Sequence, residues 1–79
     1  MPYTKVAAAI IKIMDCPAET ITPTANLVDL GIDSLKAINI LFELEEEFNI
    51  DIPNELIAEM RIVNDIVDCV SRLRHEQSI

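Results

Sequence analysis

The sequence predicts an all-α fold: a four-helix bundle of three longer helices and one short helix, with a long loop between the first and second helices. Apolar residues recur at helical spacing in three separate segments. No segment alternates between apolar and polar residues, so no sheet is expected. Gly31 is the single glycine, which leaves the chain little of the turn chemistry that hairpins need.

The first helix is expected over residues 4–15, where Thr4 can act as its N-cap. Pro17 ends this helix and opens a predicted loop over residues 17–33. A loop of this length is unusual in a small domain and is often functional. Its apolar members can pin it to the bundle, and they are Ile21, Leu27, Val28 and Leu30.

The second helix is expected to begin at Ser34 and to end near Phe48. Pro53 then breaks the chain, a short helix follows over residues 54–59, and a last helix covers residues 63–74. With 79 residues the chain has room for one domain, residues 1–79, with a small core and no deep enzyme cleft.

The chain is strongly acidic, with 14 acidic residues, 6 basic residues and a net charge of −8. Nucleic acids need a basic surface, so no nucleic-acid partner is expected, and anionic membranes are disfavoured too. No apolar run approaches the roughly 20 residues that span a bilayer, so no membrane insertion is expected. The charge favours partners with basic patches, although it can equally serve only to keep a small protein soluble.

The two cysteines, Cys16 and Cys69, stand far apart and form no metal-binding motif. A structural zinc site is not expected, because His75 is the single histidine and lies in the C-terminal tail. Reduced thiols in a cytoplasmic protein are the expected state, and we expect a monomer.

The second helix carries an apolar arc that is wider than packing requires. At 100° per residue the arc spans roughly 220°, whereas a surface helix needs about 100°. One part is a predicted core stripe, formed by Ala37, Ile40, Leu41, Leu44 and Phe48. The surplus flanks Ser34 and consists of Leu35, Ile38 and Phe42. These surplus residues either pack against the loop and the short helix or form an exposed patch that meets a partner.

Acidic residues crowd the end of the same helix. Glu45, Glu46 and Glu47 lie in its last turn, where negative charge opposes the helix dipole. Glu43 and Glu47 also repel each other at i, i+4. These acids do not serve helix stability. A solvated face explains some of them, and a docking surface for arginine and lysine explains the clustering better.

Ser34 has two interpretations on the residues alone. Serine before an apolar helix is a favoured N-cap. A serine at a helix N-terminus also suits an anionic attachment, because free backbone N–H groups and the positive end of the dipole lie beside it. A serine hydrolase is not expected, because the only candidate base is His75 in the C-terminal tail.

The second helix is preceded and opened by the run Asp29-Leu30-Gly31-Ile32-Asp33-Ser34-Leu35. This run resembles the phosphopantetheine attachment motif of acyl carrier proteins. The resemblance covers most of the chain, since residues 21–27 look like the family's loop and residues 44–53 look like the end of its second helix. It implies that Ser34 bears a covalent 4′-phosphopantetheine arm, which a holo-carrier-protein synthase, a phosphopantetheinyl transferase, transfers from coenzyme A.

The same resemblance implies roles for the neighbouring residues. Asp33 would help to position the synthase's metal and substrate, and Gly31 would allow the tight turn into the helix. The family positions that meet partner enzymes are matched here by Leu35, Ile38 and Phe42, by the acids Glu45 and Glu46, and by Lys36. Lys36 stands where fatty-acid carriers usually have an acid.

The resemblance implies a carrier without catalytic residues of its own. The arm would hold acyl intermediates as thioesters, sequester them between helices and deliver them to enzymes of fatty-acid, specialised lipid or polyketide synthesis. Expected partners are the transferase, an acyl or aminoacyl ligase, and ketoacyl synthases and related enzymes with basic docking patches. Two alternatives stay open: a stand-alone aminoacyl or peptidyl carrier, and an unmodified acidic helical adaptor in which Ser34 is only a cap.

Overall fold

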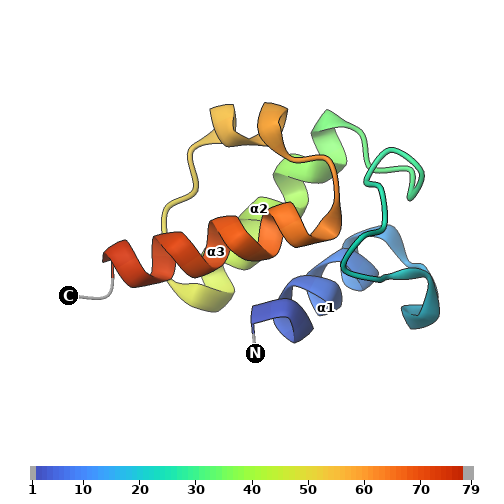
Figure 1. Cartoon of the computed structure of the whole chain (residues 1–79), viewed down its shortest axis with the longest axis horizontal. Helices are drawn as coiled ribbons and strands as arrows, with labels where there is room; N and C mark the ends of the chain where they lie inside the picture. The colour runs from blue at the N-terminus through green and yellow to red at the C-terminus, as the bar shows by residue number, and fades with distance from the viewer. Residues whose placement is uncertain (1, 78–79) are drawn as a thin grey trace.

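The computed structural model describes residues 2–77. These residues form three α-helices, α1 (Pro2–Met14), α2 (Ser34–Phe48) and α3 (Val63–Gln77), and two short 3-10 helices, η1 (Ala18–Thr20) and η2 (Asn54–Glu59). The predicted all-α bundle of three longer helices and one short helix is confirmed. Helix α1 packs against both α2 and α3, and the long loop lies at the end of the bundle where α2 begins (Figure 1).

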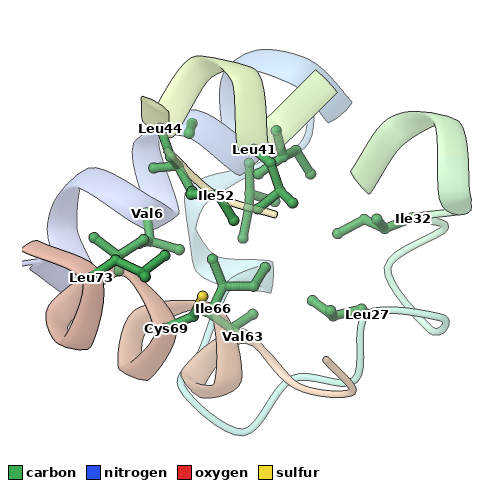
Figure 2. Close-up of a cluster of buried hydrophobic side chains, with 14 of the residues drawn as sticks. Val6, Leu27, Ile32, Leu41, Leu44, Ile52, Val63, Ile66, Cys69 and Leu73 are labelled. Carbon is green, nitrogen blue, oxygen red and sulfur yellow. The ribbon is translucent and has the colours of Figure 1, made fainter. Parts of the chain in front are cut away.

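The core consists of aliphatic side chains that come from all three α-helices and from the segments between them. Its buried members are Val6, Ala9 and Ile10 of α1; Ile40, Leu41 and Leu44 of α2; Val63, Ile66, Cys69, Val70 and Leu73 of α3; and Ile21, Leu27, Ile32, Ile50 and Ile52 of the connecting segments. Leu27 and Ile32 point from the loop toward the helices that carry Ile66 and Leu41 (Figure 2). The loop therefore contributes side chains to the core.

Helix α1 begins two residues before the predicted start, at Pro2 instead of Thr4. Proline suits the first turn of a helix, because the N–H that it lacks has no intrahelical partner there. Thr4 is therefore an exposed residue inside the helix, and the prediction that it caps α1 is wrong. The helix ends at Met14 because Asp15 adopts a left-handed conformation, with φ 53°.

Helix α3 runs to Gln77 and not only to the predicted Arg74. The Gln77 side chain accepts a hydrogen bond from Asp51 N at 2.9 Å and donates one to Asp51 O at 3.1 Å. The Arg74 guanidinium lies 4.9 Å from the centroid of the Phe48 ring, within cation–π distance. These contacts hold the last turns of α3 against the end of α2.

The long loop is tied to the segment before α3 by backbone hydrogen bonds. Leu27 N donates to Arg61 O at 2.8 Å, Val63 N to Ala25 O at 3.0 Å, and Asn64 N to Pro23 O at 2.9 Å. These bonds hold the long loop beside residues 61–64, which are far from it in the sequence.

Within the loop, Ile21 and Leu27 are buried and Leu30 is half-buried, as predicted. Val28 is 78 % exposed, so the prediction that it pins the loop to the bundle is wrong. The physical reason is an Asx turn: the Asn26 side chain accepts a hydrogen bond from Val28 N at 2.9 Å and directs the chain outward.

No helix within the described part of the chain is long and apolar enough to cross a bilayer. Cys16 and Cys69 are free thiols, the first half-buried and the second buried. Burial raises the pKa of the Cys69 thiol, which keeps it protonated and unreactive.

Candidate functional site

The turn that leads into α2 depends on Gly31. Its φ is +83°, a conformation that residues with a Cβ rarely adopt. Gly31 N donates to Val28 O at 2.9 Å, and Ile32 N donates to Leu27 O at 3.0 Å. A Cβ at Gly31 would lie 3.6 Å from Met14 Cε, which is ordinary contact. The backbone conformation, and not a lack of space, therefore requires glycine here.

Asp33 caps α2. Its side chain accepts a hydrogen bond from Lys36 N at 2.8 Å, and its backbone is extended. Ser34 is the first residue of the helix, so its interpretation as the N-cap is wrong: the neighbouring aspartate already has that role. The Ser34 hydroxyl is exposed and forms no hydrogen bond with a described residue.

The helix start around Ser34 also suits an anionic group. The backbone N–H groups of Ser34 and Leu35 donate to no described residue, as expected at the first turn of a helix. A phosphodiester on the Ser34 oxygen would lie beside these donors and the positive end of the α2 dipole. The residues present therefore fit a phosphate-linked arm.

A cavity of about 70 Å³ opens beside Ser34 and leads into the core. Asp33 and Ser34 form its polar rim. The rest of its lining is apolar and comes from the loop, α2, η2 and its exit, and α3: Leu27, Ile32, Ala37, Ile40, Leu41, Ile57, Met60 and Ile66. An apolar group that is tethered at Ser34 could therefore reach the interior of the bundle.

The structure shows whether the surplus apolar residues of α2 are packed or exposed. Leu35 is 67 % exposed and Phe42 is 54 % exposed, whereas Ile38 is half-buried. The surplus apolar residues are thus an exposed patch for the most part and not additional core. The sequence analysis did not predict that Val28 of the loop adds exposed apolar surface. The only sequence feature that could have indicated this exposure is Asn26, a residue that favours turns.

Most acids of α2 have partners within the fold. Lys12 Nζ lies 2.7 Å from Glu43 Oε1, and this contact raises the pKa of the Lys12 ammonium. Lys5 pairs with Glu47. Glu45 Oε2 accepts a hydrogen bond from Ile52 N at 2.8 Å, so this predicted docking acid also holds the chain after α2. Glu46 and the side chain of Lys36 form no hydrogen bond or ion pair with a described residue.

Among the described residues, no group of three or more histidine, cysteine, aspartate and glutamate side chains could hold a metal ion. His75 lies in the last turns of α3 and is not among the residues that line the cavity. The start of α2 therefore holds an exposed serine with an apolar cavity beside it.

Comparisons with known proteins show which family this small helical bundle belongs to. A family model described as phosphopantetheine attachment site matches residues 4–70. The chain therefore belongs to the acyl carrier protein family, whose members bear a covalent 4′-phosphopantetheine arm.

Three relatives illustrate the similarity, and each is named acyl carrier protein. The protein of Syntrophobacter fumaroxidans is 43 % identical over 75 residues, which cover 85 % of this chain and 93 % of the relative. The Helicobacter pylori protein is 38 % identical over 66 residues, covering 82 % and 85 %. The Picosynechococcus protein is 30 % identical over 70 residues, covering 87 % and 86 %.

Proposed function

We propose that Ser34 is the residue that bears the phosphopantetheine arm, and that residues 1–79 act as one carrier domain. The observation that carries this proposal is the division of tasks at the start of α2. Asp33 supplies the cap, and this leaves the exposed Ser34 hydroxyl without a structural role beside unbonded N–H groups. A serine that only served the fold would be expected to occupy the cap itself.

The attachment step is performed by a phosphopantetheinyl transferase. Ser34 Oγ attacks the phosphorus that carries the pantetheine of coenzyme A. A new P–O bond forms to Ser34, the bond to the departing adenosine 3′,5′-bisphosphate breaks, and the serine proton passes to a base of the transferase. The chain supplies the nucleophile and its position, and the transferase supplies the base. Asp33 would add negative charge beside the transferase's metal.

The cargo follows from the cavity. Its lining beyond Asp33 and Ser34 is entirely aliphatic apart from Met60, which favours an acyl chain over an aminoacyl group with its buried charge. We therefore propose acyl intermediates of fatty-acid, specialised lipid or polyketide synthesis as the cargo. The partner enzymes would include an acyl ligase and ketoacyl synthases with basic docking patches, and the chain itself would catalyse no reaction.

We propose that the carrier works in the cytoplasm, where thiols such as those of Cys16 and Cys69 are kept reduced.

The test is arm transfer in vitro. The purified chain is incubated with coenzyme A and a broad-specificity phosphopantetheinyl transferase, and its intact mass is measured. We expect one added arm on the wild type and none on Ser34→Ala. Ser71→Ala, at an exposed serine of α3, is the matched control and should be loaded like the wild type. An unchanged wild-type mass would support the adaptor alternative and refute the proposal.

A further inference from the structure

The segment that links α2 to η2 is held at residues 51–52 by side chains of two different helices. Asp51 N donates a hydrogen bond to the Gln77 side-chain oxygen at 2.9 Å, and the Gln77 side-chain nitrogen donates to Asp51 O at 3.1 Å. Ile52 N donates to Glu45 Oε2 at 2.8 Å. We call these three hydrogen bonds the linker clip. The clip joins the link before η2 both to α2 and to the last turn of α3 (Figure 1).

The linker clip satisfies backbone groups that would otherwise lack a partner in the fold. Ile52 is buried and its N–H is partly buried, so the loss of its acceptor would be costly. Glu45 is half-buried and brings its carboxylate to this N–H. Asp51 and Gln77 are exposed, so their part of the clip competes with water and depends on the geometry of its two bonds.

Helix η2 has little of its own to hold it in place. None of its residues is buried, and Leu56 and Ile57 are half-buried. A 3-10 helix also has poorer hydrogen-bond geometry than an α-helix. Ile57 and Met60, which directly follows η2, nevertheless line the cavity beside Ser34. The position of this cavity wall therefore depends on what holds the two ends of η2.

The far end of this segment is fixed by a separate set of hydrogen bonds. Arg61 N donates to Asp65 Oδ2 at 2.8 Å, and Leu27 N donates to Arg61 O at 2.8 Å. Residues 53–60 therefore form a span between two fixed ends, with the linker clip at one end and the Asp65 cap at the other. A span of this kind is expected to loosen when either end is released.

We propose that Glu45 and Gln77 are positioning residues for the cavity. Through the linker clip they fix one end of residues 53–60, and so they keep the cavity wall closed over a cargo that is tethered at Ser34. This inference rests on the proposed carrier function. Loss of the clip would leave the wall closed for less of the time and would expose the thioester more often. The last turn of α3 thus contributes to the protection of the cargo.

The first test is hydrogen exchange, measured by NMR on the full chain without an arm. Gln77→Ala should raise the exchange rates of the Asp51 amide and of the η2 amides roughly two- to tenfold, the range of one hydrogen bond. The control Tyr3→Phe removes the 3.1 Å hydrogen bond from Tyr3 Oη to Ile21 O, which lies outside the clip. It should leave the exchange of η2 unchanged.

Conservative variants separate the hydrogen bonds of the clip from its charge. Glu45→Gln keeps a side-chain oxygen that can accept from Ile52 N, so it should keep the slow exchange of this amide, whereas Glu45→Ala should not. Gln77→Glu keeps the acceptor for Asp51 N but loses the donor to Asp51 O, and it should give an intermediate rate. Fast exchange in Glu45→Gln equal to that in Glu45→Ala would show that the charge, and not the hydrogen bond, holds the link.

The second test measures protection of the cargo without a partner enzyme. The holo chain is loaded with an octanoyl group, and hydroxylamine is added. Hydroxylamine attacks the thioester carbonyl, which forms a hydroxamate and releases the free thiol of the arm. Gln77→Ala and Glu45→Ala should be cleaved roughly two- to tenfold faster than the wild type, and Tyr3→Phe at the wild-type rate. Octanoyl-pantetheine gives the rate for an unprotected thioester.

Equal exchange of η2 in the wild type and in Gln77→Ala would overturn the inference. Faster exchange of η2 with an unchanged rate of cleavage would also overturn it, because the clip would then hold η2 without protecting the cargo. In both cases Ser34 is still loaded and the proposed function stands. A wild type that accepts no arm at Ser34 would instead refute the proposed function, and the inference with it.

Discussion

At the scale of the residue, Asp33 and Ser34 share the start of α2 but have different tasks. The Asp33 carboxylate accepts the hydrogen bond from Lys36 N and so satisfies one of the free N–H groups in the first turn of α2. The Ser34 hydroxyl stays exposed and forms no hydrogen bond with a described residue. The left-handed conformation of Gly31 forms the turn that leads into α2.

Two substitutions of Asp33 separate its role as the N-cap of α2 from the role of its negative charge in arm transfer. Asp33→Ala should lower the free energy of unfolding by about 1 kcal/mol, the usual cost of losing an N-cap. Asp33→Asn keeps a cap-forming oxygen and should keep most of that stability, yet it should slow arm transfer because the charge is lost. Urea denaturation and transferase kinetics measure the two effects. Equal loss of stability in both variants would contradict the cap.

The sequence was sufficient to predict that α2 begins at Ser34, and the resemblance of residues 29–35 to an attachment motif singled out this serine. It was not sufficient to predict which of two adjacent residues caps the helix, since aspartate and serine are both good caps. Nor could periodicity decide whether other parts of the fold bury Leu35 and Phe42. Periodicity gives the direction of a side chain, whereas coverage depends on elements distant in sequence.

At the scale of the element, α3 begins with a hydrogen-bonded carboxylate. Asp65 Oδ2 accepts hydrogen bonds from Arg61 N at 2.8 Å and from Ile62 N at 3.1 Å. These two bonds hold the pKa of the Asp65 carboxyl below its ordinary value. The same segment pairs with the long loop, so this cap also supports the cavity wall.

The lowered pKa of Asp65 predicts a pH-dependent contribution to stability. A carboxyl whose pKa is lower in the folded state stabilises the fold above its unfolded pKa, and this contribution is lost as the pH falls through the folded value. The difference in free energy of unfolding between wild type and Asp65→Asn should therefore be largest near pH 7 and should shrink below about pH 4. Urea titrations at several pH values measure it. A difference that is the same at all pH values would argue against the ionised cap.

The long loop contains a matched pair of adjacent residues with opposite environments. Leu27 is buried in the cavity wall and Val28 is 78 % exposed. Leu27→Ala should cost about 2 kcal/mol or more in unfolding free energy, whereas Val28→Ala should change it by less than about 0.5 kcal/mol. Thermal or urea unfolding distinguishes them. Similar losses in both variants would mean that the Asx turn does not expose Val28.

Helix positions were predicted to within a few residues, and the errors have local causes. Pro2 extends α1 because proline is favoured in the first turn, and Gln77 extends α3 because it bonds to the Asp51 backbone. The pairing of the loop with residues 61–64 was not predicted, because backbone hydrogen bonds between distant segments leave no periodic pattern in the sequence.

At the scale of the whole molecule, the small aliphatic core holds the fold, and we propose that it also receives the cargo. Its cavity of about 70 Å³ has room for a few water-sized groups, which is less than a long acyl chain occupies. One wall of the cavity is formed by Ile57, which lies in η2, and by Met60, which directly follows it. A short 3-10 helix has weaker internal hydrogen bonding than an α-helix. This wall is the side expected to move.

Acylation of the arm should therefore change hydrogen exchange locally. Amides of η2 and of the loop that lines the cavity should exchange at altered rates in the acylated carrier compared with the carrier that bears a free arm. Amides of α1 should exchange as before, because α1 contributes nothing to the cavity lining. Exchange read out by mass spectrometry tests this. Identical rates in both forms would show that the acyl chain stays outside the bundle.

The most direct measurement is the mass of the chain as it is isolated from its native host, followed by fragmentation that locates any added group. The account predicts one phosphopantetheine arm, with or without an acyl group on its thiol, and places it on Ser34. A chain of unmodified mass from cells that contain an active transferase, or an arm on any other residue, would contradict the account.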